Sequence, residues 1–262
     1  MIVGGVDIGS ATGKAVVMKD GEILSMNLMA ATTNPQNTAQ MVMEKAIAEA
    51  GLSSIEDLDS VVSTGYGRLK IPFAQENISE ISCHAKGAHW MASGTRTVVD
   101  IGGQDCKVIS VTEKGTVLNF VMNDRCAAGT GRFFEAMARA LCCGLDGISA
   151  LENQGDDPCI ISNQCSVFAE SEVVTLVNEG TDLGNIIAGI NISVASRLTS
   201  MVRRVGLKEE LVLTGGCSKN EGLARALAGK LKVTISKLPL DPQLAGALGA
   251  ALIAAEKLIA DS

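Results

Sequence analysis

The chain contains the same short pattern twice, and this repeat restricts the possible folds more than any other feature of the sequence. In the first copy an apolar run enters Asp7-Ile8-Gly9-Ser10, and Lys14 follows seven residues after the aspartate. In the second copy an apolar run enters Asp100-Ile101-Gly102-Gly103, and Lys107 again follows seven residues later. Two further strand-like runs, joined by a glycine-containing turn, follow in each copy. Each copy therefore predicts an antiparallel meander of three strands whose first loop carries an acid and glycines.

Helical patterns follow both predicted meanders. One covers residues 38–50 with Asn37 as its expected N-cap, and another covers residues 131–141. A later helical pattern has its apolar face over residues 186–202, and its other face carries Arg197, Arg203 and Arg204, a basic edge that is expected to be solvated surface. The remaining predicted elements are a buried strand over residues 211–214, a helix over 220–228 and a final helix over 245–258.

Duplicated lobes of the βββα type predict an α/β protein with two lobes. We place the first lobe at residues 1–95, completed by a C-terminal helix at 245–262, and the second lobe at residues 96–244. Hairpins with glycine turns are common, so a chance similarity of the two segments is the alternative interpretation. The equal spacing from aspartate to lysine in both copies favours a true duplication.

Charge and hydropathy exclude several classes of partner. The formal net charge of −7 argues against a nucleic-acid-binding surface, which needs a basic stripe. The apolar start is short and meets Asp7 at once, so no signal peptide is expected. The longest apolar run, Leu244–Ala255, has 12 residues, fewer than the roughly 20 that span a bilayer. We therefore expect a cytoplasmic protein without a nucleic-acid or membrane partner.

The acidic glycine turns favour a nucleotide site. A polyphosphate needs converging backbone N–H groups, which glycine-tolerant turns provide, and its Mg²⁺ needs nearby carboxylates, often reached through water. The turns after Asp7 and Asp100 supply one such loop from each copy. A third glycine turn, Gly215-Gly216, lies where a strand meets a helix and could hold the adenosine. The duplication suggests two lobes that close on a nucleotide between them.

In this order the three turns resemble those of the actin, Hsp70 and sugar-kinase superfamily. The resemblance implies a two-lobed actin-like ATPase fold, which is ribonuclease H-like, with adenosine on the segment 213–220. Asp7 and Asp100 would then be catalytic, and Gln104 and Asp105 would orient the attacking water. The implied nucleotide-binding residues are Gly9, Ser10, Ala11, Thr12, Gly13, Lys14, Gly102, Gly103, Gly215, Gly216 and Gln243.

Two of the eight cysteines directly precede helical patterns. Cys126 comes before a Gly-Thr-Gly helix start, and Cys165 comes before the pattern that begins at Ser166. The N–H groups and partial positive charge of a helix start favour a thiolate or a negatively charged cluster. Two thiols cannot complete the four-cysteine shell of a 4Fe–4S cluster, but a two-fold dimer can. On the residues alone, buried or redox-paired cysteines remain the alternative.

The cysteine segments, together with Asp100–Asp105 and Thr64–Arg68, resemble the activator ATPases of 2-hydroxyacyl-CoA dehydratases, in a family that includes subunits of benzoyl-CoA reductase. The resemblance implies that Cys126 and Cys165 of both chains of a homodimer hold one 4Fe–4S cluster. It further implies that ATP drives transfer of one electron from a ferredoxin or flavodoxin to a dehydratase or related reductase. The segment Ile81–Ala85 fits the same family, although its chemistry is not assigned.

Two other functions are compatible with the fold. A sugar or acyl kinase of the same superfamily would need a carboxylate base for a substrate hydroxyl, and the sequence singles out none. An actin-like filament or scaffold protein would have no enzymatic role. Neither alternative explains the cysteine segments.

Overall fold

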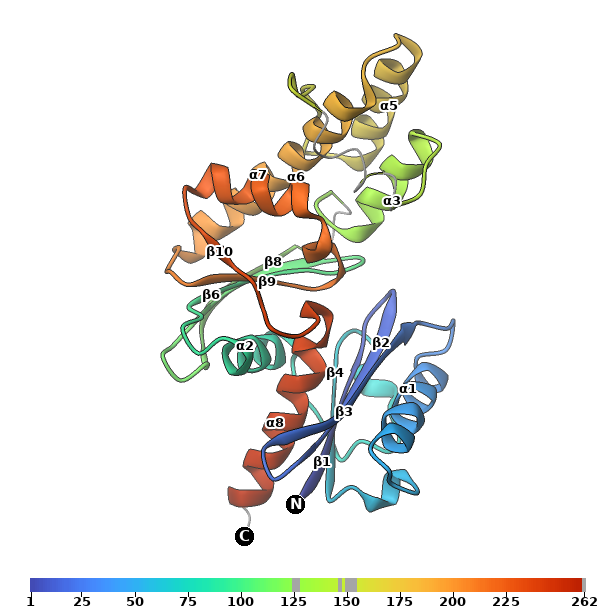
Figure 1. Ribbon diagram of the computed structural model, residues 1–262, viewed down its shortest axis with the longest axis vertical. Helices are drawn as coiled ribbons and strands as arrows, with labels where there is room; N and C mark the ends of the chain where they lie inside the picture. Colours follow the sequence, from blue (N-terminus) through green and yellow to red (C-terminus); the bar gives the residue numbers. More distant parts are fainter. Residues whose placement is uncertain (124–127, 146–147, 149–154, 261–262) are drawn as a thin grey trace. The chain divides into compact units, whose positions relative to one another are not determined.

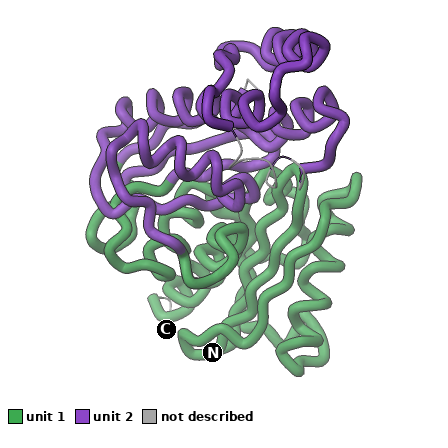
Figure 2. Tube along the Cα trace, turned by 45° about the horizontal axis from the view of Figure 1, so that its top comes forward, with its two compact units in different colours: residues 1–98, 111–118, 238–262 green, residues 99–110, 119–237 purple. Residues whose placement is uncertain are grey.

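The computed structural model describes residues 1–123, 128–145, 148 and 155–260 (Figure 1). The chain separates into two compact units, which Figure 2 shows in different colours. Unit 1 contains Met1–Val98, Val111–Leu118 and Leu238–Ser262. Unit 2 contains Val99–Ser110 and Asn119–Lys237. Each unit is described below by itself.

The first sheet has five strands in the order β3-β2-β1-β4-β5. The first three strands form the predicted antiparallel meander, and β4 and β5 extend it in parallel pairing with β1 and β4 respectively. In this register Asp7 lies opposite both Lys14 on β2 and Thr64 on β4. The strands are β1 (Ile2–Ile8), β2 (Thr12–Lys19), β3 (Glu22–Ala30), β4 (Ser60–Thr64) and β5 (Glu76–Asn77).

Helices cover both faces of the first sheet (Figure 1). On β2, Ala15 and Val17 join the core cluster of α1 (Pro35–Glu49), whereas Val16 and Met18 join that of α8 (Ala245–Ala260). Successive strand side chains point to opposite faces, so burial on both faces explains the nearly continuous apolar runs of β1 and β2. The remaining elements of unit 1 are α2 (Glu80–Met91) and the 3₁₀ turns η1 (Ile55–Asp57), η2 (Arg68–Lys70) and η4 (Pro242–Leu244).

The predicted N-cap of the first helix is wrong by one turn. The helix begins at Pro35, and the Asn34 side chain, not that of Asn37, accepts a hydrogen bond from the backbone N–H of Gln36. Proline is well suited to the first helical position, because its fixed φ fits a helix and its missing N–H would have no partner there. Asn37 therefore lies inside the first turn.

The final helix is apolar because it is a core element of unit 1. The segment Pro242–Ala260 is, among the described residues, the one helical stretch long and apolar enough to cross a membrane by length and composition. Half of its most apolar window is buried inside the unit. A side chain on Gly5 of β1 would collide with the α8 backbone at Ala247 and Ala251. This close packing of helix on strand accounts for the many small residues of α8.

The second sheet repeats the first strand for strand. Its strand order is β10-β9-β6-β7-β8. Read from the other end, this is β8-β7-β6-β9-β10, which corresponds strand by strand to β3-β2-β1-β4-β5 of the first sheet. The duplicated meanders predicted from the sequence are thus confirmed. The strands are β6 (Thr97–Ile101), β7 (Cys106–Val111), β8 (Val117–Asn123), β9 (Leu211–Thr214) and β10 (Ile235–Ser236).

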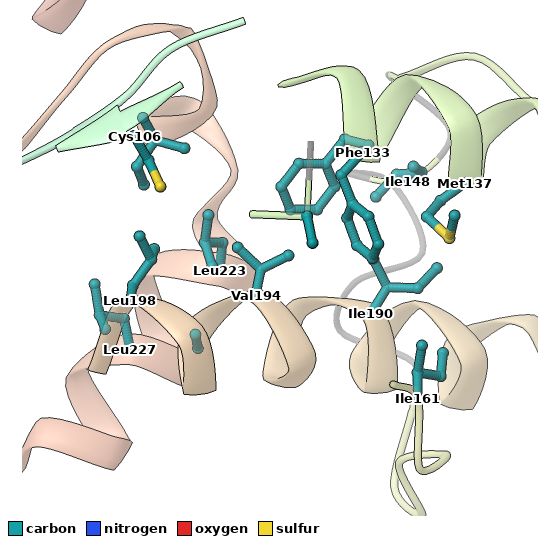
Figure 3. Close-up of a cluster of buried hydrophobic side chains, with 14 of the residues drawn as sticks. Cys106, Phe133, Met137, Ile148, Ile161, Ile190, Val194, Leu198, Leu223 and Leu227 are labelled. Carbon is teal, nitrogen blue, oxygen red and sulfur yellow. The ribbon is translucent and has the colours of Figure 1, made fainter. Parts of the chain in front are cut away.

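The core of unit 2 is built around the long helix α6 (Leu183–Val205). Figure 3 shows Ile190, Val194 and Leu198 of α6 beside side chains from the neighbouring helices α3 and α7. This apolar face has the 3.6-residue period predicted from the sequence. The other elements are α3 (Gly131–Ala140), α5 (Ser166–Asn178), α7 (Glu221–Leu231) and the 3₁₀ turn η3 (Gly216–Lys219).

Candidate nucleotide and cysteine sites

The first predicted phosphate loop joins β1 to β2 in unit 1. Asp7 is buried at the end of β1, and its Oδ2 lies 3.2 Å from Nζ of Lys14. The loop is closed by its own hydrogen bond, in which the backbone N–H of Gly9 donates to the carbonyl of Thr12 at 3.0 Å. The loop backbone itself therefore closes the turn. Of the other predicted residues, Ser10 is half-buried, Ala11 is exposed and Gly13 is buried on β2.

The second loop, between β6 and β7 in unit 2, has the same construction. The backbone N–H of Gly102 donates to the carbonyl of Asp105 at 3.0 Å, which matches the bond in the first loop. Lys107 is fully buried, and its Nζ lies 3.0 Å from Oδ2 of Asp100 and 2.8 Å from Oδ1 of Asp105. Gln104 is exposed at the tip of the loop. The predicted catalytic residues Asp100 and Asp105 thus both form ion pairs with the ammonium group of Lys107.

A threonine and a glycine at the end of β4 and of β9 complete the repeat. Gly65 and Gly215 both have positive φ, +86° and +81°. A side chain on Gly215 would lie 2.5 Å from the carbonyl oxygen of Ile101 and 2.8 Å from Oδ1 of Asp100, and one on Gly65 would meet Oδ1 of Asp7. Glycine is therefore required in both copies by backbone conformation and by close approach to the aspartate.

Thr214 lies in the segment 213–220 that is predicted to hold adenosine, but its contact with Asp100 was not predicted. Its hydroxyl donates to Oδ1 of Asp100 at 2.9 Å, so each oxygen of that buried carboxylate accepts a hydrogen bond. The only sequence signal was its place at the end of a buried strand, directly before the glycine turn. Gly216 follows in η3, and Gln243 lies in η4 of unit 1, where its backbone N–H is capped by Asp241.

One of the differences between the two loops adds a carboxylate to the second copy. Thr12 and Asp105 occupy equivalent places, two residues before the lysine. Lys14 donates to the backbone carbonyl of Thr12 at 3.4 Å, whereas Lys107 pairs with the side chain of Asp105. The second copy therefore carries an additional carboxylate, held by a buried cation.

We expect Lys107→Met to destabilise the fold more than Lys14→Met. Each substitution leaves buried negative charge without its cation, which typically costs about 3–5 kcal/mol. Among the described residues Lys107 neutralises two carboxylates and Lys14 one, so the two lysines are matched controls for each other. Urea unfolding of both variants would measure the difference. Equal losses would show that Asp105 contributes no buried charge in the folded state.

The cysteine segments lie at helix starts, as far as the structure describes them. Cys165 is the half-buried N-cap residue of α5, and Cys126 lies outside the described residues. Thr130 is the N-cap of α3, but its side chain makes no capping hydrogen bond. Instead, the backbone N–H groups of Gly131 and Arg132 donate to the carbonyls of Gly102 and Gly103, at 2.9 and 2.8 Å. The second phosphate loop thus caps α3 directly.

Of the three arginines on the expected solvated edge, Arg203 and Arg204 are exposed, but Arg197 is half-buried, so the expectation is wrong for Arg197. Its guanidinium donates to the carbonyl of Asn163 at 3.0 Å and to Oδ1 of Asn123 at 3.4 Å. Asn163 lies two residues before Cys165, and Asn123 lies three residues before Cys126. The side chain is half-buried on α6, where it links the segments that lead into the two cysteines.

Burial makes three other cysteines poor ligands. Burial raises the pKa of the thiol to about 12 in Cys83, about 11 in Cys106 and about 12 in Cys217. A metal or cluster binds the thiolate, which is scarce at neutral pH when the pKa is that high. These three thiols are therefore not expected to bind a metal or cluster.

Two sheets of identical strand order, each with an acid, a lysine and a glycine turn at the ends of its central strands, define a two-lobed ATPase of the actin type. The chain belongs to the BadF/BadG/BcrA/BcrD ATPase family, whose sequence pattern matches residues 5–254. The predicted fold class, the family resemblance and the ATPase class are thereby confirmed.

Known proteins of this family are similar over nearly their whole length. An activator of lactoyl-CoA dehydratase from Anaerotignum propionicum is 46% identical over 252 residues, which cover 96% of each chain. The crystal structure of (R)-2-hydroxyglutaryl-CoA dehydratase component A from Acidaminococcus fermentans has a TM-score of 0.94 at 42% identity and covers 99% of both chains. The activator of the 2-hydroxyisocaproyl-CoA dehydratase from Clostridium difficile with bound ADPNP has a TM-score of 0.92 at 41% identity, covering 100% of this chain and 97% of that one.

Proposed function

We propose that this chain is the ATP-dependent activator of a 2-hydroxyacyl-CoA dehydratase or a related acyl-CoA reductase. It would act as a homodimer and deliver a low-potential electron from a ferredoxin or flavodoxin to that partner. The relatives named as dehydratase activators support this activity. So do the two phosphate loops and the cysteine segments of the chain itself.

In this proposal the nucleotide binds the residues predicted from the sequence. The loops Gly9–Lys14 and Gly102-Gly103 hold the phosphates, Gly215 and Gly216 hold the adenosine, and Gln243 is a further nucleotide-binding residue. Asp7 and Asp100 hold a hydrated Mg²⁺, for which buried and oriented carboxylates are suitable ligands. Gln104 and Asp105 orient the water that attacks the terminal phosphate, yielding ADP and phosphate.

The residues that are described fit a shared cluster. Cys165 lies at the accessible start of a helix, and each chain offers only two cysteines in the predicted motifs, so Cys126 and Cys165 of two chains would hold one 4Fe–4S cluster. Such a cluster supplies one-electron transfer. Val167 and Phe168, which follow Cys165, each expose 65% of their surface, as expected where a second chain docks.

The proposal rests mainly on two backbone hydrogen bonds between the second phosphate loop and the start of α3. The N–H groups of Gly131 and Arg132 donate to the carbonyls of Gly102 and Gly103, so a shift of this loop would displace the start of α3. Cys126 lies five residues before Gly131. A change at the phosphates therefore has a direct hydrogen-bonded route to the segment that would hold the cluster.

We expect the nucleotide state to change how fast a chelator removes iron from the reduced protein. The rate would be measured anaerobically with saturating ADP and with a non-hydrolysable ATP analogue. A ligand shifts a conformational equilibrium only by its differential affinity for the two states. Different rates would support coupling between the nucleotide and the cluster. Identical rates would contradict it and leave an ATPase whose cluster is structural.

A further inference from the structure

His84 is a buried residue of unit 1 that the proposed nucleotide site does not use. It lies on α2, in the segment Ile81–Ala85 whose chemistry the sequence left unassigned. Burying a polar group without hydrogen bonds is unfavourable, so buried imidazoles are found where they meet polar atoms. The surroundings of His84 therefore indicate its role.

The position of His84 is fixed by the close crossing of α2 and α8. A side chain on Gly87 of α2 would collide with the carbonyl oxygen of Ala245, and one on Gly249 of α8 would collide with that of Cys83. The two helix backbones are therefore in direct contact on both sides of His84. Such close packing holds the imidazole at a defined place beside the first turn of α8.

That place is next to the Asp7 carboxylate. A Cβ atom on Gly246, in the first turn of α8, would lie 2.7 Å from Oδ2 of Asp7 and 3.1 Å from Nε2 of His84. Both polar atoms therefore face the same small space, which glycine leaves open. The ammonium of Lys14 lies 3.2 Å from the same carboxylate oxygen.

The repeat shows why Asp7 needs a further donor. In unit 2 the hydroxyl of Thr214 donates to Asp100, but the equivalent Thr64 donates its hydroxyl proton to the carbonyl of Ile78 at 2.9 Å. A hydroxyl has one proton, so Thr64 cannot also donate to Asp7.

We propose that His84 is a positioning residue for ATP hydrolysis, which holds the Asp7 carboxylate in the orientation that the hydrated Mg²⁺ requires. The inference rests on the proposed nucleotide site, because His84 acts through Asp7. The imidazole N–H at Nε2 donates to Oδ2 of Asp7 directly or through one water. This hydrogen bond keeps the carboxylate from turning toward Lys14. His84 thus gives Asp7 a side-chain donor, as Thr214 does for Asp100, but on the oxygen that Lys14 also contacts, whereas Thr214 and Lys107 bind different oxygens of Asp100.

The test is ATP hydrolysis by the complete chain alone, without dehydratase partner, for His84→Ala, His84→Gln and His89→Ala. We expect His84→Ala to lower kcat about 10- to 100-fold, the range for one hydrogen bond to a charged group, with KM for MgATP nearly unchanged. His84→Gln keeps an N–H donor near the position of Nε2 and should restore most of the rate. His89→Ala is the matched control, because His89 lies on the same helix but packs at Gly115.

A second variant tests the geometry. In Gly246→Ala the new methyl group would separate Asp7 from His84, so we expect a similar loss of kcat. The methyl group would also lie 2.7 Å from Oδ2 of Asp7, so Gly246→Ala should lower kcat in the His84→Ala background too, but by less than in the unmodified chain. Fully additive losses would mean that Gly246 and His84 act independently, which would overturn the proposed arrangement.

The inference is also overturned if His84→Ala keeps the wild-type kcat, or if it raises KM with kcat unchanged. An equal loss in His84→Gln would likewise show that the N–H donor is not the active feature. Asp7→Asn, measured in parallel, distinguishes a wrong nucleotide site from a wrong role for His84. If Asp7→Asn retains full activity, the nucleotide site itself is misplaced; if only Asp7→Asn is inactive, His84 alone is wrongly assigned.

Discussion

Protein with Cys126→Ser is expected to contain no iron–sulfur cluster while it still binds ATP. A 4Fe–4S cluster needs four thiolates, and each chain of the proposed dimer supplies two. One substitution therefore removes two of the four ligands, because both chains carry it. The phosphate loops lie on other segments and should keep their affinity for nucleotide. Cys165→Ser should have the same effect for the same reason.

The measurement is iron and sulfide content together with an absorption spectrum, all under anaerobic conditions. Cys142→Ser is the control, since Cys142 is an exposed thiol at the end of α3 outside both motifs. It should retain about four irons per dimer, the content of one cluster. The same content in Cys126→Ser protein would show that this cysteine is not a ligand.

Asp100→Asn is expected to lower Mg²⁺-dependent ATP hydrolysis by about 10²-fold or more, comparable to removing one electrostatic group from a preorganised site. The substitution keeps the shape of the side chain and removes the charge that would face the metal. Lys107 retains Asp105 as its partner, so the variant should still fold. Asp7→Asn should have a similar effect through the first loop.

Circular dichroism and steady-state hydrolysis, measured on the same preparations, would check this prediction. Asp156→Asn, at an exposed position of unit 2, changes the net charge by the same amount and should leave the rate unchanged. If both Asp7→Asn and Asp100→Asn hydrolyse ATP at the rate of the unmodified protein, the nucleotide does not bind at the repeated turns.

The repeated part of the fold was predictable because the sequence signals for it lie between residues close together in the chain. The spacing from Asp7 to Lys14 corresponds to one hairpin, and the register places those two residues opposite each other. Asp100 and Lys107 have the same spacing across the loop between β6 and β7, and they form an ion pair. Strand period and glycine turns are short-range signals, so the order of the first three strands of each copy follows from them.

The parts that sequence reasoning missed depend on contacts between distant segments. Thr214 meets Asp100 although 114 positions separate them, and Arg197 meets Asn123 from 74 positions away. His84 reaches the side of Asp7 because two helices cross without intervening side chains. A helical pattern shows which face is polar, but not which partner that face meets.

The packing of α8 has a consequence for how the protein is made. This helix belongs to the core of unit 1, yet a ribosome synthesises all of unit 2, residues 99–110 and 119–237, before it. At about 5–20 residues per second, the face of β1 that α8 covers stays bare for on the order of ten seconds. Unit 2 has its whole core encoded in one nearly continuous stretch and can fold during that interval. The second-made half of the duplication should therefore be the first to become protease-resistant on the ribosome, with the N-terminal half following once α8 has emerged.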